Sequence, residues 1–345
     1  KFFGFEMNAE KIISNVISGS DLSEDETFQI INAIFEGKIS EEKIISFLQA
    51  LSEKGESVEE IVGAVKSMRK HSIKVNTNLK DLVDCCGTGG LGKNIMNIST
   101  CSAFVAAAGG VKIAKHGNRT STGVSGSADI LEAAGVNISI DSEQVSKCLE
   151  SVGIGFMFAQ NHHPGMKYVM PARAKIGKKT IFNLLGPLTN PAGALKQNIG
   201  VFDKKWIIPI TETLKKLGAE RALVFHSEDG LDEISAAKKT YVAELKKNKI
   251  IEFEIEPEDF DIENFDINLL KVTSAKDSYE KVMKTLNGSF PAGEEIIKLN
   301  AAAIIYTSGL ASSIDHGFSI AEKIIHSGRA NEKLQALIEI SNSFK

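Results

Sequence analysis

A glycine-rich segment with the sequence GTGGLG occupies Gly87–Gly92, directly after a short apolar run. Glycines let a backbone approach a ligand closely and turn its N–H groups toward that ligand. Ser99 and Thr100 then open an alanine-rich helical stretch, and a helix N-terminus adds oriented donors with a partial positive charge. Together they predict an anion-binding site. The spacing fits neither GxxxxGK(S/T) nor GxGxxG, and a plain glycine-rich turn with Ser99 as the helix cap is the alternative.

A second polar group, Lys115–Arg119 with the sequence KHGNR, follows the apolar run Val111–Ala114. We expect this group at the carboxyl end of a strand, where ligands bind in open α/β sheets. Lysine suits a phosphate because it carries a compact point charge. A solvated loop is the alternative, and His116 has no spacing partner for a metal.

Adjacent carboxylates stand at Asp232 and Glu233, after Gly230 and a predicted strand over 221–225. Hard oxygen ligands on one side of a loop suit Mg²⁺, which keeps several waters and bridges phosphates. Arg173 is a separate candidate, because a guanidinium can hold a carboxylate with two hydrogen bonds. A surface Asp-Glu pair and a solvent-facing arginine are the alternatives.

The elements that must position these residues are of two types, and the first is a helical N-terminal part. From about residue 8 to residue 72, apolar residues recur at i, i+1, i+4 and i+5, as in 12–17 and 30–35. Ser23 stands three residues before Glu26, which is a capping-box pattern. Gly37 and Gly55 separate the segments. This part predicts a bundle of about four helices.

After Thr77, short apolar runs alternate with helical stretches, which predicts an α/β sheet domain with ligand loops at the strand ends. The turn-rich stretch 186–193 predicts a hinge or crossover, and the acidic stretch 252–263 predicts a solvated loop or edge. The predicted strands are 82–86, 111–114, 154–158, 197–202 and 221–225, and the predicted helices include 100–108, 127–134, 207–217, 294–311 and 320–340.

Composition limits the class of protein. The chain has 345 residues, of which 43% are hydrophobic and 24% charged, as is ordinary for a globular protein of two domains. The net charge of −4 provides no global basic field for nucleic acid. Cys85, Cys86, Cys101 and Cys148 show neither metal-ligand spacing nor a disulfide pattern, so we expect reduced thiols in a cytoplasmic protein. No run approaches the roughly 18 to 20 apolar residues that span a bilayer, so no membrane partner is expected.

Seven strings follow one another along the chain. They are GTGG at 87–90, NIST at 97–100, KHGNR at 115–119, SGSAD at 125–129, IGFMFAQNHHPGMK at 154–167, TIFNLLGPLTNP at 180–191 and GLDE at 230–233. In order and wording they resemble the anthranilate phosphoribosyltransferase family of tryptophan biosynthesis. The match is collinear over nearly the whole chain, and TIFNLLGPLTNP is too long to arise by chance. The GTGG string and the helical parts are shared with pyrimidine nucleoside phosphorylases.

The resemblance implies a role for each matching position. The glycine loop would hold the pyrophosphate of phosphoribosyl pyrophosphate, and Lys115 its phosphates. Asn118 and Arg173 would bind anthranilate, with Arg173 near the carboxylate. The implied substrate-binding set is Gly87, Thr88, Gly89, Gly90, Asn97, Ser99, Thr100, Lys115, His116, Gly117, Asn118 and Arg173. Ser99, Asp232 and Glu233 would hold Mg²⁺, and Lys115, Asp232 and Glu233 would act in catalysis.

The resemblance also implies an architecture, that of the nucleoside phosphorylases and phosphoribosyltransferases. In this family a small helical domain is hinged to a larger α/β domain with a central, mostly parallel sheet. We expect residues 7–75 and about 163–190 in the helical domain, and residues 78–162 and 191–345 in the α/β domain. Since the family usually dimerises through the helical domains, a homodimer is expected.

Three positions depart from the family pattern. Leu91 stands where the glycine loop usually has Asp, Ile95 where a Ser or Thr usually precedes NIST, and Val124 where a Lys usually precedes SGSAD. The site thereby lacks one carboxylate, one hydroxyl and one cation near the same substrate. We therefore expect weaker binding of phosphoribosyl pyrophosphate than in an ordinary family member.

The implied reaction displaces pyrophosphate from C1 of the ribose with the amine of anthranilate. Mg²⁺, backbone N–H groups and Lys115 would stabilise the leaving group, and an aromatic amine needs no strong base because it is neutral at pH 7. Closure between hinged domains would position the substrates and exclude water. The alternatives are another acceptor, phosphorolysis of a pyrimidine nucleoside, and a non-catalytic nucleic-acid-binding relative. NLLGPLTNP and the Asp232–Glu233 pair count against phosphorolysis, and nucleic-acid binding would need a basic face.

Overall fold

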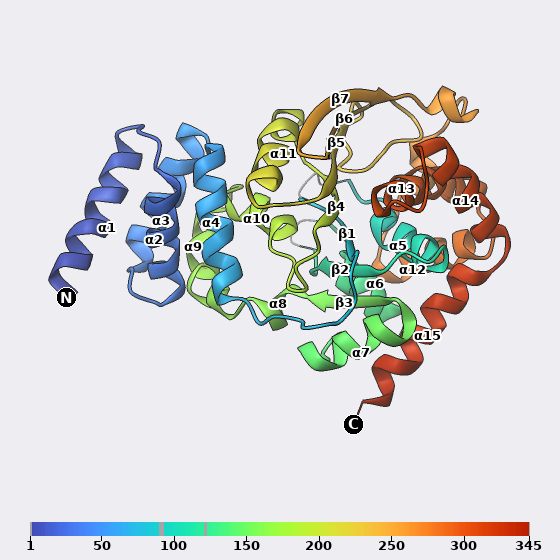
Figure 1. The fold of residues 1–345 in the computed structure, drawn as a ribbon, viewed down its shortest axis with the longest axis horizontal. Coiled ribbons are helices and arrows are strands. Elements are labelled where there is room, and N and C mark those ends of the chain that lie inside the picture. The colour runs from blue at the N-terminus through green and yellow to red at the C-terminus, as the bar shows by residue number, and fades with distance from the viewer. Residues whose placement is uncertain (1, 90–92, 121–122, 345) are drawn as a thin grey trace.

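A seven-stranded sheet lies at the centre of the larger domain in the computed structural model, which describes residues 2–89, 93–120 and 123–344, with side chains from residue 9 onward (Figure 1). The strand order is β3-β2-β1-β4-β5-β6-β7. The first five are parallel, and β6 and β7 add an antiparallel hairpin at one edge. The predicted mostly parallel sheet is thus confirmed. The strands are β1 Val83–Gly87, β2 Ile113–Gly117, β3 Ile154–Phe158, β4 Lys196–Gly200, β5 Arg221–Ser227, β6 Thr240–Lys246 and β7 Lys249–Ile255.

The N-terminal part is a helical bundle, as predicted. It consists of α1 (Phe2–Ile17), α2 (Glu24–Phe35), α3 (Glu41–Lys54) and α4 (Val58–His71). The capping box of α2 is present, since Ser23 Oγ accepts from the Glu26 N–H at 3.3 Å and Glu26 Oε2 accepts from the Ser23 N–H at 2.9 Å. Gly55 ends α3 with a φ of 90°, a conformation that glycine adopts at little steric cost.

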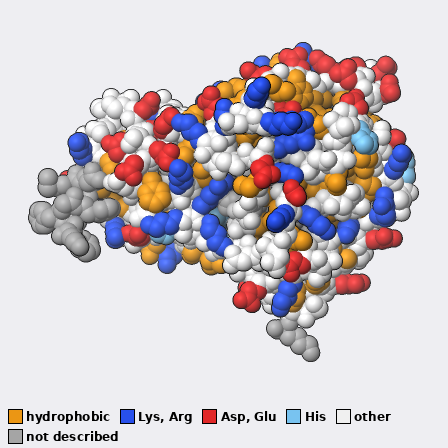
Figure 2. Space-filling model, viewed as in Figure 1, with side chains coloured by type: hydrophobic (Ala, Val, Ile, Leu, Met, Phe, Trp, Pro, Cys, Tyr) orange, Lys and Arg blue, Asp and Glu red, His pale blue; other side chains and the backbone are white. Residues whose placement is uncertain are grey.

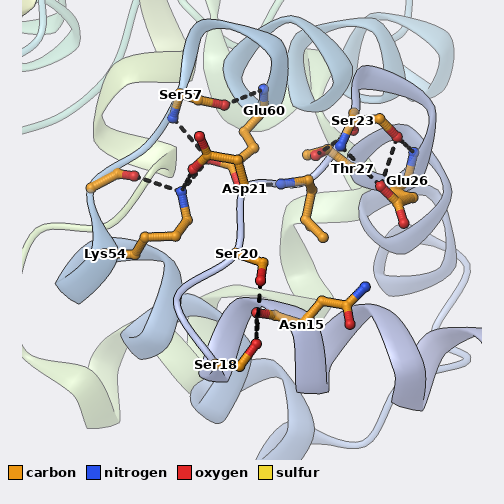
Figure 3. A network of polar contacts seen from close by, with 12 residues as sticks. Asn15, Ser18, Ser20, Asp21, Ser23, Glu26, Thr27, Lys54, Ser57 and Glu60 are labelled. Atoms are coloured by element: carbon orange, nitrogen blue, oxygen red, sulfur yellow. Dashed lines mark hydrogen bonds and ion pairs between the residues drawn. The ribbon is translucent and has the colours of Figure 1, made fainter.

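A buried polar network around Glu60 ties the start of α4 to the rest of the bundle (Figure 3). The Glu60 carboxylate accepts from the Leu22 N–H at 2.9 Å, from the Ser57 N–H at 2.8 Å and from Lys54 Nζ at 2.9 Å. Lys54 also pairs with Asp21 at 2.5 Å. Both oxygens of Glu60 meet donors, so the cost of burying this carboxylate is offset.

Helices cover both faces of the sheet, and a hydrophobic cluster forms on each. Leu223 belongs to the cluster that includes α5 and α13, whereas Val224 belongs to the cluster that includes the bundle, α10 and α11. Successive strand residues point to opposite faces, which explains the alternation. The remaining helices are α5 Ile98–Ala108, α6 Ser127–Ala133, α7 Ser142–Val152, α8 Ala159–His162, α9 Met170–Ile176, α10 Phe182–Leu188, α11 Ile207–Lys216, α12 Ala275–Leu286, α13 Pro291–Ser308, α14 Ile314–His326 and α15 Arg329–Ser343, with 3-10 turns at Pro164–Tyr168, Lys204–Trp206, Pro257–Phe260 and Ile267–Leu270.

Several predicted boundaries were wrong. The strand β2 continues to Gly117, so Lys115 and His116 lie within it rather than in a loop after it; both are buried because their polar atoms find partners inside the protein. The stretch 186–193 is not all turn, because α10 runs to Leu188 and its apolar side chains are buried. The stretch 320–340 forms two helices, which Gly328 separates with a φ of 75°.

The hairpin of β6 and β7 was missed as a pair of strands. The acidic stretch 252–263 includes the end of β7, the edge strand, so the prediction of an edge was right there. The sequence of such an edge gives a weak local signal, since pairing with β6 and not local preference fixes the strand.

Candidate active site

The glycine loop after β1 lies against Asp232, beyond the carboxyl end of the parallel strands. The Gly89 N–H donates to Asp232 Oδ2 at 2.8 Å. A Cβ at Gly87 would lie 2.3 Å from the same oxygen, so a larger residue there would displace the carboxylate. Thr88 fixes the loop from the other side, because its Oγ1 accepts from the Phe202 N–H at 2.9 Å. The loop and the predicted metal ligand therefore form one structural unit.

A second cluster joins Glu233, Ser99 and Lys115. The Ser99 N–H, in the first turn of α5, donates to Glu233 Oε1 at 3.1 Å. Lys115 Nζ donates to Ser99 Oγ at 3.3 Å and to Cys85 O at 2.6 Å. Lys115 is only 3% exposed although it is charged. The structure thus brings together three residues that sequence analysis assigned to the metal and the phosphates.

Two carboxyl groups in these clusters, those of Asp232 and Glu233, face one ammonium group, that of Lys115. Loss of water around Glu233, and then repulsion from Asp232, raises the pKa of the Glu233 carboxyl group to about 8, and Lys115 offsets only part of this. Burial also raises the pKa of Asp232. A bound cation would relieve this repulsion.

The donor set fits Mg²⁺ that is shared with a phosphate ligand. Within the described residues, no group of three or more His, Cys, Asp or Glu side chains is arranged to hold a metal. Two carboxylates with a nearby hydroxyl suit an ion that keeps several waters and takes further oxygens from substrate phosphates. They do not suit a metal enclosed by protein ligands alone.

His116 joins β2 to α10 and to His163 through buried polar contacts. Its Nδ1 lies 3.1 Å from Gly186 O in α10, and its Nε2 lies 3.2 Å from His163 Nε2. A carbonyl oxygen only accepts, so His116 Nδ1 carries the proton and donates to Gly186 O. In a neutral ring the other nitrogen is an acceptor, so His116 Nε2 accepts from His163 Nε2. Burial lowers the pKa of His116 to about 4 and, with the charge of His116, that of His163 to about 2, so both rings are neutral at pH 7.

Asp84 in β1 anchors the same region. Its Oδ1 accepts from the His116 N–H at 3.1 Å, and its Oδ2 accepts from Asn190 Nδ2 at 2.7 Å. Asn190 also donates to Ala114 O at 2.8 Å. Burial raises the pKa of Asp84 to about 6. The turn after α10 is thereby fixed to β1 and β2.

Arg173, on α9, contacts the same helix α10. Its Nη2 donates to Asn183 Oδ1 at 3.3 Å, one helical turn before the Gly186 carbonyl that contacts His116. Burial lowers the pKa of Arg173, and no acidic side chain in the described part of the chain pairs with it. A half-buried guanidinium without an acidic partner is suited to a carboxylate ligand.

Other predicted site residues are less directly placed. Asn97 Oδ1 accepts from Ser278 Oγ at 2.7 Å, so its side chain is engaged within the protein. Thr100 is buried, and its hydroxyl has no partner among the described residues. Asn118 is exposed, and its Oδ1 accepts from the Arg119 N–H at 2.8 Å rather than contacting Arg173.

Further predicted positions require glycine or fall outside the described residues. A Cβ at Gly117 would lie 2.1 Å from Ser127 Oγ, which explains the glycine there. Gly90 and Leu91 lie outside the residues that the structure describes. Ile95 and Val124, the other two departures, are partly buried and pack against the α5 cluster.

Sequence analysis missed four residues of this region. His163 and Asn190 lie inside the HPGMK and LTNP strings, and that membership was the available signal. Asp84 precedes the glycine loop within an apolar strand and gives no signal of its own. Lys179 directly precedes TIFN, and its Nζ lies 3.6 Å from the centre of the Phe202 ring.

Charged side chains are mixed on the face shown in Figure 2. Lys and Arg side chains spread over the middle of this face, between the helical domain on the left and the α/β domain on the right, with acidic side chains among them. A nucleic-acid-binding surface would be continuously basic, and this face is not.

Comparison with known proteins identifies the family. Residues 79–331 match the profile described as "Glycosyl transferase family, a/b domain", and residues 10–72 match "Glycosyl transferase family, helical bundle domain". The anthranilate phosphoribosyltransferase of Marinomonas sp. (strain MWYL1) is 48% identical to this chain over 340 residues, which are 98% of each chain. The chain belongs to the anthranilate phosphoribosyltransferase family.

Solved structures of this family share the fold. The anthranilate phosphoribosyltransferase of Thermus thermophilus aligns with a TM-score of 0.91 and 37% identity, over 96% of this chain and 99% of that one. The enzyme from Saccharomyces cerevisiae, solved in complex with phosphoribosyl pyrophosphate and Mg, aligns with a TM-score of 0.89 and 28% identity, over 98% and 99%. The family architecture of a small helical domain and a larger α/β domain is confirmed.

Among the described residues, none of the helices is both long and apolar enough to cross a membrane.

Proposed function

We propose that this chain transfers the phosphoribosyl group of phosphoribosyl pyrophosphate to anthranilate, with release of pyrophosphate, in tryptophan biosynthesis. The observation that carries the proposal is that the glycine loop, Lys115 and the Asp232–Glu233 pair meet near the carboxyl ends of the parallel strands. The name shared by the relatives supports the same reaction.

Phosphoribosyl pyrophosphate, the donor, would bind beside the side chains of Asp232 and Glu233. Asp232 and Glu233, with Ser99, would hold Mg²⁺, which supplies a Lewis acid that draws charge from the departing pyrophosphate. Lys115 adds a positive charge that is fixed by two hydrogen bonds before the substrate arrives. The remaining proposed donor contacts are Gly87, Thr88, Gly89, Gly90, Asn97 and Thr100.

The acceptor would bind between α9, α10 and the end of β2. Arg173 would hold the carboxylate of anthranilate, and Asn118, His116 and Gly117 would line the same pocket. Because both His116 nitrogens are occupied within the protein and the ring is neutral, His116 would orient the acceptor's surroundings without adding charge. The aromatic amine already carries the lone pair that attacks the ribose carbon.

We also propose how the chain divides and assembles. Residues 7–75 with about 163–190 would move as one body, and residues 78–162 with 191–345 as the other. Burial of Val169, Ala172 and Leu184 in the cluster of the bundle supports the first grouping. A homodimer through the helical domains, as is usual in the family, and a cytoplasmic location complete the proposal; the four cysteines are free thiols.

The test is turnover by the purified chain. Anthranilate fluorescence should fall when phosphoribosyl pyrophosphate and Mg²⁺ are both present, and omission of either, or addition of a chelator, should stop the change. Phosphoribosyl transfer to another amine, with anthranilate unchanged, would show that the acceptor is wrong. Phosphate-dependent cleavage of a pyrimidine nucleoside would replace the proposal with phosphorolysis.

A further inference from the structure

Lys179 belongs to the helical domain by its backbone and reaches the α/β domain with its side chain. It lies between α9 and α10, and its carbonyl oxygen accepts from Ser52 Oγ of α3 at 3.2 Å. Its Nζ lies 3.6 Å from the centre of the ring of Phe202, which follows β4 in the α/β domain. The side chain therefore crosses from one domain to the other.

The far end of this crossing is the corner that holds the glycine loop. The Phe202 N–H donates to Thr88 Oγ1 at 2.9 Å, and the Gly89 N–H of the same loop donates to Asp232 Oδ2 at 2.8 Å. Burial lowers the pKa of Lys179, and the carboxylates of Asp232 and Asp203 oppose that shift. The ammonium of Lys179 thus lies within electrostatic reach of a proposed metal ligand.

The present partner of this ammonium is a weak one. No carboxylate within the described parts of the chain forms an ion pair with Lys179, and an aromatic face binds a cation less strongly than a phosphate oxygen does. Two other cations of the site are engaged, since Arg119 pairs with Asp129 and Lys93 donates to the Asp229 carbonyl. Lys179 is therefore placed to exchange its aromatic partner for an anion.

We propose that Lys179 binds the pyrophosphate group of the donor, and so supplies from the helical domain a positive charge that the α/β domain lacks at Val124. This inference rests on the proposed function. When the donor binds, the ammonium leaves the Phe202 ring for a phosphate oxygen. Since its backbone is attached to α3, that contact ties the helical domain to the α/β domain across the donor.

The chain offers a matched control in the neighbouring lysine. Lys178 has the same charge and lies one residue away, but it is exposed to solvent. Calorimetric titration with phosphoribosyl pyrophosphate, and separately with inorganic pyrophosphate, both with Mg²⁺, compares wild type with Lys179→Ala and Lys178→Ala. We expect roughly ten- to hundredfold weaker binding of both ligands by Lys179→Ala, the range for a charged hydrogen bond, and less than about threefold by Lys178→Ala.

Two further measurements separate binding from folding. Lys179→Arg should recover most of the affinity, and the dissociation constant of Lys179→Ala should depend less on salt than that of wild type. The KM for anthranilate should change little in either variant. Equal affinity of wild type and Lys179→Ala for both ligands would overturn this inference alone. Failure of wild type to bind either ligand would contradict the proposed function as well.

Discussion

Two glutamates differ in how the protein compensates their charge: Glu60, buried in the helical domain, and Glu233, partly buried beyond the carboxyl ends of the central strands. Glu60 accepts hydrogen bonds from two backbone N–H groups and from the ammonium of Lys54 (Figure 3). Glu233 accepts from the Ser99 N–H but lies beside a second carboxylate, Asp232, and its pKa is raised to about 8.

The difference separates a carboxylate that stabilises the fold from one that is suited to a ligand. A buried charge whose donors are all supplied by the protein adds structure and leaves nothing for a cation to do. A pair of carboxylates with too few donors costs stability in the empty protein, and a cation restores the balance. The Glu60 network is thus electrostatically complete, whereas the proposed metal site would be completed by the cation that it binds.

Loss of the carboxylate pair is expected to have the largest effect. Asp232→Ala with Glu233→Ala should reduce Mg²⁺-dependent turnover by about 10²–10³-fold or more, because one preorganised electrostatic element commonly contributes that much. The melting temperature should change little, since the removed repulsion between the carboxyl groups offsets the hydrogen bonds lost from the Gly89 and Ser99 N–H groups. Steady-state kinetics and thermal unfolding check both parts, and undiminished turnover would rule out the metal assignment.

The same kind of change at Glu60 should affect stability and not catalysis. Glu60→Leu leaves two backbone donors and Lys54 without their acceptor, which should cost about 3–5 kcal/mol of unfolding free energy. Glu59→Leu is the control, because Glu59 is exposed on the same helix and pairs with Lys216 at the surface. Urea unfolding measures the difference, and the KM values of the folded fraction should remain unchanged. Equal stability of the two variants would contradict the structural role of Glu60.

Removal of Arg173, the proposed cation of the acceptor site, should affect one substrate selectively. Arg173→Ala should raise the KM for anthranilate by about ten- to hundredfold, since a charged hydrogen bond is worth roughly 1.5–3 kcal/mol. The KM for phosphoribosyl pyrophosphate should change far less. Initial rates with each substrate varied in turn provide the comparison. A change confined to phosphoribosyl pyrophosphate would place Arg173 in the donor site.

The raised pKa of Asp84 predicts that the free energy of unfolding depends on pH. Its pKa in the folded protein is about 6, above the ordinary value of 3.8, so folding favours the protonated form. The stability that this group contributes is therefore full below about pH 4 and is lost as the pH rises through 6. Asp84→Asn keeps an acceptor for the His116 N–H but does not titrate. Relative to this variant, wild type should lose about 2–3 kcal/mol between pH 4 and pH 7. Thermal melts of both proteins across that range should diverge; parallel curves would contradict the assignment.

The departures from the family pattern should have the smallest effect. Ile95→Ser and Val124→Lys should together tighten binding of phosphoribosyl pyrophosphate, each by on the order of 1 kcal/mol, the net value of a typical hydrogen bond. Both residues pack against the core, so some of the gain will be offset by lost apolar contact. Calorimetry at fixed Mg²⁺ compares the double variant with wild type. Equal affinities would show that these departures do not weaken donor binding.

Local patterns in the sequence were sufficient for much of the fold. The capping box at Ser23 and the helical spacing that follows depend on residues three or four apart, so the start of α2 was predictable. The strands β1, β3, β4 and β5 were predictable for the same reason, since apolar runs bounded by turns mark buried parallel strands. The end of β2 was not predictable, because partners distant in sequence allow Lys115 and His116 to be buried there.

The candidate site was predictable in composition but not in its connections. Lys115, Ser99 and Glu233 were each recognised, and the structure shows that they meet. The contact between His116 and His163 joins residues 47 positions apart, and that between Asp84 and Asn190 joins residues 106 apart. No spacing rule predicts such contacts. The contact of Lys179 with the Phe202 ring belongs to the same class, since it joins the segment between α9 and α10 to the residues after β4.

The most direct test of the contrast between the two glutamates is the effect of Mg²⁺ on donor binding. Calorimetric titration with phosphoribosyl pyrophosphate, in Mg²⁺ and in chelator, is carried out on wild type, on Asp232→Asn with Glu233→Gln, and on Glu59→Leu as a surface control. We predict that Mg²⁺ tightens binding by about tenfold or more in wild type and in the control, and that this gain disappears in the carboxamide variant. A gain of equal size in the carboxamide variant would show that the cation is held elsewhere and would contradict the account.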